Sequence, residues 1–115
     1  MRTRVNYDVR ARDAEAIAFT ATSLTGTLTF SHTGFLIGLI VAVPDFTNSI
    51  TVTASIADAD GNEIASQAAM AKNATAMVHF DIGYCPLYGE TTITFTLSGV
   101  AGLGGGDLTV TVITV

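Results

Sequence analysis

The chain has 115 residues, of which 49% are apolar and only 13% are charged, and its formal net charge is −5. This length suits one domain and leaves no room for a second, while the low charge indicates that part of the apolar surface contacts another protein. The opening residues lack the apolar core of a secretory signal, and the lone Cys85 excludes an internal disulfide framework, so we expect a small buried thiol.

Basic residues gather at the start of the chain. Residues 1–12 have a balance of 4 − 1 = +3, and residues 13–115 have one lysine and nine acidic residues, 1 − 9 = −8. The acidic body argues against a nucleic-acid partner. The arm is expected either to dock on an acidic protein surface, which includes a neighbouring copy, or to remain a solvated, frayed terminus. Its basic residues, which we assign to docking, are Arg2, Arg4, Arg10 and Arg12.

Apolar and polar residues alternate along most of the chain, which is the pattern of strands with one buried face. Residues 5–11 form a strand or an extended arm in this interpretation. Further strands are predicted at 17–21, 24–30, 35–43, 50–57, 63–69, 76–82, 92–97 and 108–115. Turns are predicted at 31–34, 44–49, 58–62, 72–75 and 98–107, and a loop at 83–89.

The segment 63–77 is ambiguous in the sequence. Its alanine, methionine, glutamine and lysine content favours a helix by propensity alone. The stretch from Lys72 to Thr75 resembles a turn, however, and residues 76–82 alternate as a strand does. We therefore predict two short strands around a turn.

The most apolar stretch, Phe35 to Val43, is too short to cross a bilayer and too rich in glycine and β-branched residues for a helix. It is predicted to be a strand buried on both faces, so that no membrane contact is expected. One face would fill the core with Phe35, Ile37, Leu39, Val41 and Val43. The other face needs a cover, either the N-terminal segment or a second subunit. We predict that a second subunit contacts Leu36, Ile40 and Ala42.

About eight short strands separated by turns predict an all-β protein, an antiparallel β-sandwich that is jelly-roll-like. An immunoglobulin-like strand order uses the same alternation and stays open. Residues 1–15 are predicted to be a basic N-terminal arm or edge strand, and residues 16–115 a single β-sandwich domain.

No catalytic, cofactor-binding or metal site is assigned. Asp58, Asp60 and Glu63 supply too few oxygens, at the wrong spacing, for an EF-hand, and a hairpin turn explains them better. His32 and His79 lack the sequence context of a hydrolase triad, so we predict that the chain is not an enzyme.

Sugar binding is an alternative that β-sandwich proteins often support. Such sites stack sugars on exposed aromatic rings, and this chain has no tryptophan. Tyr84 and Tyr88 share one predicted loop, which keeps a carbohydrate-binding module among the alternatives.

Four stretches make the chain resemble small virion proteins of tailed bacteriophages, especially the decoration or cement proteins on the outside of a capsid. They are VPDFTNSITVTASIADADGNEI, KNATAM, CPLYGETTITFTLSGVAG and GGGDLTVTVITV, in roughly the last two-thirds of the chain. The resemblance implies a small sandwich or jelly roll, commonly trimeric, that clamps neighbouring subunits of the major capsid protein. Residues 1–15 match no motif of this family.

The expected function is therefore that of a structural virion protein, a homotrimer that binds and stabilises the major capsid protein shell without a cofactor. It would lie on the capsid exterior after assembly in the host cytoplasm. A phage tail or fibre component is a further alternative.

Overall fold

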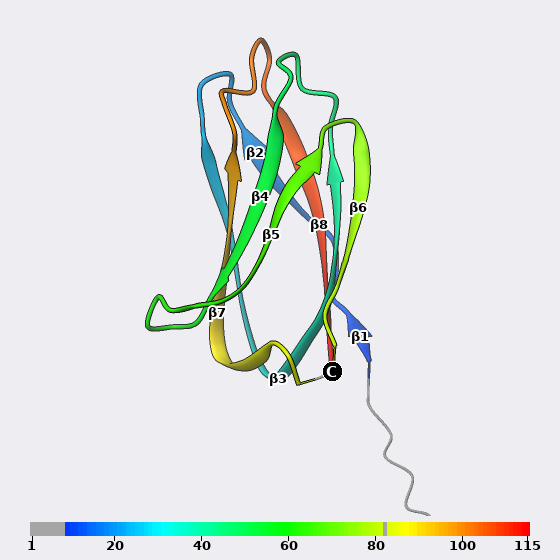
Figure 1. Cartoon of the computed structure of the whole chain (residues 1–115), viewed down its shortest axis with the longest axis vertical. Coiled ribbons are helices and arrows are strands. Elements are labelled where there is room, and N and C mark those ends of the chain that lie inside the picture. The colour runs from blue at the N-terminus through cyan, green and yellow to red at the C-terminus, as the bar shows by residue number, and fades with distance from the viewer. Residues whose placement is uncertain (1–8, 82) are drawn as a thin grey trace, which may run out of the picture.

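The computed structural model describes residues 9–81 and 83–115, and all regular structure within them is β (Figure 1). The predicted all-β antiparallel sandwich is confirmed. The strands are β1 (Arg10–Ala11), β2 (Glu15–Phe19), β3 (Thr25–Val43), β4 (Thr51–Ala57), β5 (Glu63–Ala71), β6 (Ala74–His79), β7 (Pro86–Leu97) and β8 (Gly106–Thr114).

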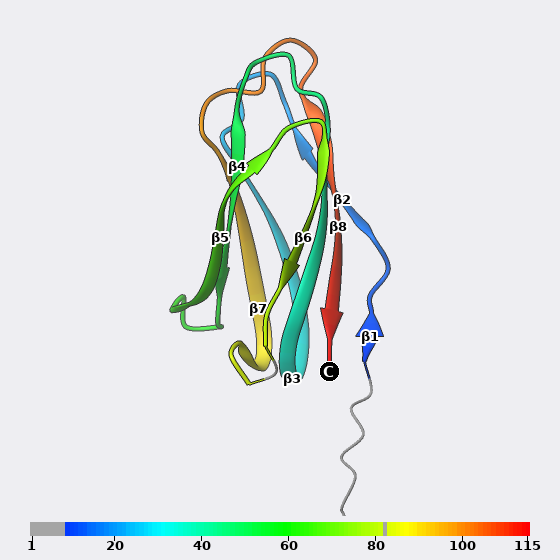
Figure 2. The same ribbon diagram turned by 45° about the vertical axis from the view of Figure 1, so that its right-hand side comes forward.

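The strands form two antiparallel layers that share β3. Sheet A has β8 and β6 on either side of the second half of β3, with β1 and β2 beside β8, and sheet B has the order β3, β7, β4, β5. Figure 2 shows sheet A on the right and sheet B on the left. Each sheet thus interleaves strands that are distant in sequence. This is the order of a jelly roll in which one long strand serves both sheets.

The predicted turn at 31–34 is wrong, because these residues lie inside β3. Their partners are Leu87 to Glu90 in β7, and Phe35 pairs with Pro86. The predicted loop at 83–89 is correspondingly too long. Gly34 has a φ of 146°, and a Cβ there would collide with the carbonyl oxygen of Val115. Glycine often marks a turn, but at position 34 the missing side chain leaves space for the backbone of Val115.

β3 changes the phase of its alternation where it passes from sheet B to sheet A. A register shift lies between Leu36 and Gly38. Before the shift the even-numbered residues Leu28, Phe30 and Leu36 face the core, and after it the odd-numbered Leu39, Val41 and Val43 do. The predicted face assignment is therefore wrong at its start: Leu36 is 0% exposed, whereas Phe35 and Ile37 are half-buried.

The core lies between the two sheets, and the alternation predicted most of it. Val52, Ala54 and Ile56 of β4 in sheet B are all fully buried, and Val110 and Val112 of β8 in sheet A belong to the same buried cluster. Removing one large aliphatic side chain from water contributes roughly 1.5–3 kcal/mol, so these inward-facing rows stabilise the sandwich. Cys85 is 0% exposed, as predicted.

The segment 63–77 forms two strands around a turn, as predicted. Asn73 has a φ of 52°, a backbone conformation that asparagine tolerates. Lys72 closes the turn onto the preceding loop, since its Nζ donates to the carbonyl oxygen of Phe46 at 2.7 Å and lies 3.4 Å from Asp45 Oδ1. Pairing with β4 and β3 outweighs the helix propensity of the segment.

The two long sides of the sandwich differ. On one side β2 packs against the start of β3, where a Cβ at Gly26 would press on Ile17 and Phe19. On the other side β5 is the last strand of sheet B and β6 the last strand of sheet A. These two edges do not pair with each other, and they leave the groove described below.

Candidate interaction surfaces

The middle of the outer face of sheet A carries no charged side chain, although the exposed Asp107 stands on the same face of β8, two residues before Thr109. Ile40 and Ala42 of β3 lie between Met77 and Thr75 of β6 on one side and the threonines of β8 on the other. Met77 is 77% exposed. We call this surface the sheet A face and define it by Ile40, Ala42, Thr75, Met77, Thr109, Thr111 and Ile113.

The predicted oligomer residues divide between the two sides of sheet A. Ile40 and Ala42 are half-buried on the sheet A face, but Leu36 is fully buried in the core, so its assignment to a subunit interface is wrong. The register shift after Leu36 is the physical reason. β1 and β2 extend sheet A sideways beside β8. Neither strand therefore covers the sheet A face, which was the alternative predicted for the N-terminal segment. Whether a second subunit contacts Ile40 and Ala42 stays a prediction.

The described part of the basic arm lies against the sandwich. Arg10 is in β1, opposite Thr114 of β8. The Arg12 guanidinium lies 5.3 Å from the centroid of the Phe30 ring and donates to the carbonyl oxygen of Ser31 at 3.5 Å. The docking role of these arginines stays a prediction, and Arg2 and Arg4 lie outside the described residues.

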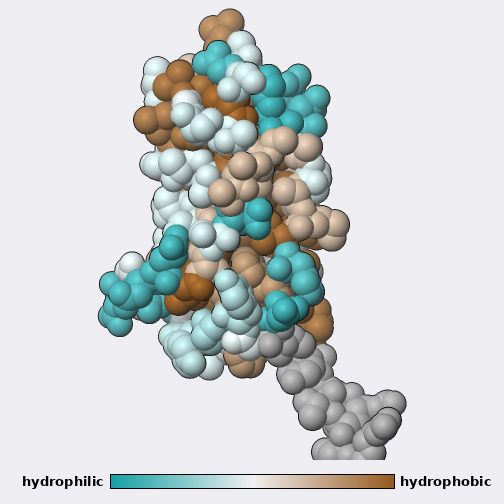
Figure 3. All heavy atoms as spheres, in the orientation of Figure 1, coloured by the Kyte–Doolittle hydropathy of each residue, from teal (hydrophilic) through white to brown (hydrophobic). Residues whose placement is uncertain are grey.

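An apolar tip lies at the end of the sandwich where the β2–β3 and β7–β8 loops meet. Leu24, Val100 and Leu103 are 47%, 41% and 87% exposed. Backbone hydrogen bonds join the loops, since Gly102 donates to the Ala21 carbonyl at 3.2 Å. Figure 3 shows apolar atoms gathered at this end. Sequence reasoning missed this surface because the glycine-rich stretch at 98–107 indicated only a bend.

The acidic turn is explained by its own hydrogen bonds. Asp58 Oδ1 accepts the backbone N–H groups of Asp60 and Asn62 at 3.0 and 2.9 Å, and Glu63 accepts the Ser55 hydroxyl at 2.7 Å. These contacts are those of an Asx turn at the end of a hairpin. Among residues 9–81 and 83–115, no group of three or more histidine, cysteine or acidic side chains could hold a metal ion.

The histidines and the cysteine do not form one site. His32 Nε2 lies 3.3 Å from the carbonyl oxygen of Val115, whereas His79 Nε2 lies 3.8 Å from Asp81 Oδ1. Burial raises the pKa of the Cys85 thiol to about 11, so it is a poor nucleophile at neutral pH. The prediction that the chain is not an enzyme remains untested. No helix long and apolar enough to cross a bilayer occurs in the described part of the chain.

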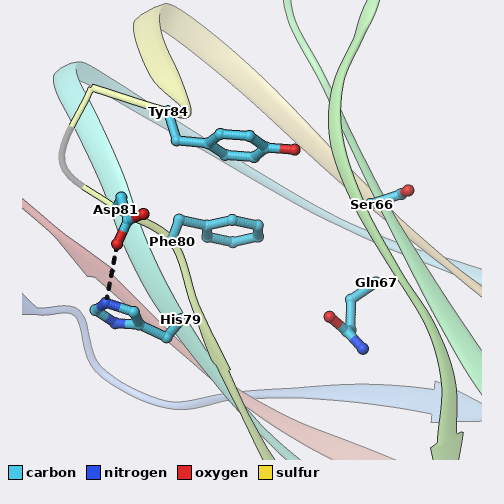
Figure 4. A pocket seen from close by; sticks show the side chains of 6 residues that line it. All are labelled: Ser66, Gln67, His79, Phe80, Asp81 and Tyr84. Carbon is cyan, nitrogen blue, oxygen red and sulfur yellow. Dashed lines mark ion pairs between the residues drawn. The ribbon is translucent and has the colours of Figure 1, made fainter.

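A groove of about 420 Å³ lies between the β5 and β6 edges (Figure 4). One wall is the end of β6 and the turn after it, and the other is β5. Tyr84 lies in this groove, but Tyr88 belongs to β7 and does not line it. The two tyrosines that the sequence placed in one loop are therefore on different surfaces. The groove residues are Ser66, Gln67, His79, Phe80, Asp81 and Tyr84.

No protein-family model matches the sequence, and no curated protein is similar to it. The structure is similar to VP2 of infectious bursal disease virus, with a TM-score of 0.52 and 12% identity over 92% of this chain and 32% of that chain. It is also similar to the protein of T=1 particles derived from the same virus, with a TM-score of 0.51 and 11% identity over 94% of this chain and 31% of that chain. A protein of Bacillus endospore appendages, which are disulfide-linked pili, has a TM-score of 0.49 and 14% identity over 99% of this chain and 96% of that chain.

The two viral likenesses show that this jelly-roll fold also occurs in a capsid protein. The chain spans about a third of the length of the capsid proteins that it matches. The fold therefore defines the class, a jelly-roll β-sandwich protein, and the surfaces described above must indicate what it does.

Proposed function

We propose that this protein is a structural virion protein, a capsid decoration protein that binds the outside of the major capsid protein shell as a homotrimer. The observation that carries the proposal is the middle of the sheet A face, where Ile40, Ala42 and Met77 lie together among threonines and the nearest acidic residue on that face of β8 is Asp107, at its end. Water-exposed faces of antiparallel sheets are usually polar, whereas the centre of a protein–protein interface is depleted of charged residues and enriched in side chains such as methionine. The jelly-roll fold, shared with a virus capsid protein, fits this role.

The sheet A face would join the copies of the trimer. Met77 projects from the edge strand β6 and is 77% exposed, so it is available to pack on another copy. The threonines beside it combine a methyl group with a hydroxyl, which can hydrogen-bond across a contact. Linking three copies raises the strength of each copy's weak contact with the shell, because the later contacts form within one assembly.

The basic arm would contact the shell. Arg12 is held against Phe30 and Ser31, and β1 pairs with β8, so the described end of the arm starts from a fixed place on the sandwich. The arginines before it would meet an acidic surface of the capsid protein. Contacts between exposed charges weaken with salt, so binding to shells should fall as ionic strength rises.

The experiment combines two measurements on the full chain. Sedimentation velocity should show a trimer, and co-sedimentation with purified shells should show saturable binding that Arg2→Glu with Arg4→Glu weakens. These substitutions leave β1 intact, unlike a deletion of residues 1–12. A protein that is only monomeric at high concentration and does not bind shells would overturn the proposal.

Cryo-electron microscopy of the parent particle distinguishes capsid decoration from the alternative role as a tail or fibre component. Density for this jelly roll on the outer surface of the shell supports decoration. Density confined to the tail or its fibres would instead assign the chain to that part of the virion.

A further inference from the structure

We propose that the groove between β5 and β6 is a binding site for a neutral saccharide. This inference does not rest on the proposed capsid role, since a decoration protein and a tail protein could both carry such a site. The groove is formed by the unpaired edges of the two sheets, and its volume of about 420 Å³ lies within the roughly 300–1,000 Å³ of small-molecule sites.

The groove has a stacked aromatic pair at its wall. The rings of Phe80 and Tyr84 are 6.0 Å apart between centroids and 7° from parallel. Phe80 is 6% exposed and Tyr84 is 66% exposed, so Phe80 supports one side of a ring whose other side meets water. The backbone N–H of Tyr84 donates to the Asp81 carbonyl at 3.0 Å, so the residue that carries the exposed ring is hydrogen-bonded to the groove wall that follows β6. The platform is thus formed before any ligand arrives.

Hydrogen-bonding groups stand on both sides of this platform (Figure 4). The Tyr84 hydroxyl points across the groove toward β5, where Ser66 and Gln67 lie. Asp81 and His79 are on the opposite wall. A sugar ring needs an apolar surface for its C–H groups together with hydroxyl, amide and carboxylate groups for its hydroxyls, and the groove supplies both.

The charges and geometry of the groove argue against other ligands. Its residues include Asp81 but no lysine or arginine, so a phosphate or an acidic sugar would meet no fixed cation. The near-parallel rings offer one face rather than the several walls of an aromatic cage, which disfavours a quaternary ammonium ion.

An added peptide strand also fits poorly. β5 is interrupted by register shifts opposite Val52 to Ala54 and Ile56 to Ala57, and Ala69 has a φ of 59°. Bulges of this kind twist an edge strand away from regular pairing.

The test is a binding titration of the full chain against neutral α- and β-linked hexose oligosaccharides, with uronate-bearing oligosaccharides as the charged comparison. We expect at least one neutral series to bind. Tyr84→Ala should weaken that binding about tenfold through loss of the stacking surface. The matched control is Tyr88→Ala, because Tyr88 is 79% exposed but outside the groove, and it should bind as the unchanged protein does.

Two further variants keep the test informative if Tyr84→Ala fails to fold. Tyr84→Phe should retain most of the binding because the ring remains, and Gln67→Ala should weaken it because an amide on the facing wall is lost. Binding to none of the neutral oligosaccharides, binding only to the acidic series, or equal losses from Tyr84→Ala and Tyr88→Ala would each overturn the proposal. So would a loss of shell binding or oligomer from Tyr84→Ala without any neutral-sugar binding, because the groove would then be a protein contact.

Discussion

Ile40 of β3 lies directly opposite Met77 of β6 on the sheet A face. Phe80 donates its backbone N–H to the Ile37 carbonyl at 3.0 Å, and hydrogen-bonded pairs alternate along an antiparallel ladder. Ile40 and Met77 are therefore a non-hydrogen-bonded pair, the type with the closer side chains. The two side chains form one apolar spot between threonines.

Met77→Asp should dissociate the oligomer without unfolding the domain. A carboxylate buried at a subunit contact without a partner is strongly unfavourable, whereas at an exposed position of the monomer the free energy of unfolding should change by only about 0.5 kcal/mol. Sedimentation velocity and urea unfolding measure the two effects separately. The control is Thr96→Asp, at an exposed strand position of sheet B. Unchanged assembly of Met77→Asp would remove the sheet A face from the interface.

Ile40→Asp should dissociate the oligomer as well, with some added cost to the fold because Ile40 is half-buried. The expected result is a folded monomer in sedimentation and circular dichroism. A variant that melts without passing through a folded monomer would show that Ile40 serves the fold rather than a subunit contact.

Leu36→Ala should lower the free energy of unfolding by about 2–5 kcal/mol, because it removes a fully buried side chain and leaves a cavity. Ile40→Ala is the comparison from the same strand and should cost distinctly less in the isolated domain. Urea unfolding at a concentration where the protein is monomeric gives both values. Equal costs would contradict the change of phase between Leu36 and Gly38.

Lys72→Met should destabilise the β5–β6 turn by about 1.5–3 kcal/mol, the usual contribution of a hydrogen bond to a charged group. The lost contact is the 2.7 Å bond from Lys72 Nζ to the Phe46 carbonyl. Asp45→Asn should cost less than about 1 kcal/mol, because the Asp45 side chain is 66% exposed. Urea unfolding distinguishes the two, and an equal loss would show that the ion pair, not the carbonyl contact, holds the turn.

Cys85 should make stability depend on pH in the alkaline range. The folded thiol has a pKa of about 11 against 9.0 when unperturbed, so the unfolded chain loses its proton first. The contribution is complete below pH 9, declines as pH rises toward 11, and amounts to at most about 2–3 kcal/mol. Cys85→Ala removes this thiol but keeps the tyrosines and Lys72, which also titrate in the alkaline range and so affect both proteins alike. The difference in unfolding free energy between the two proteins should therefore change with pH, and a constant difference would contradict the raised pKa.

The sequence alone predicted the fold class and much of the core. Residues 50–57 illustrate why: one face of β4 is buried and the other is not, so the two-residue period of the strand appears directly in the sequence. The turn at Asn73 was also predictable, since few residues adopt its backbone conformation. These features depend on neighbours along the chain.

Pairing between distant strands decided the rest. Leu36 faces the core because β3 changes partners from β7 to β8 at that point, and no local pattern marks the change. Gly34 appears as a turn in the sequence but makes room for Val115. The groove brings Ser66 and Gln67 of β5 to Phe80 and Tyr84 only because two sheet edges end side by side. Local periodicity thus determined the strands, and long-range packing determined which of their side chains share a surface.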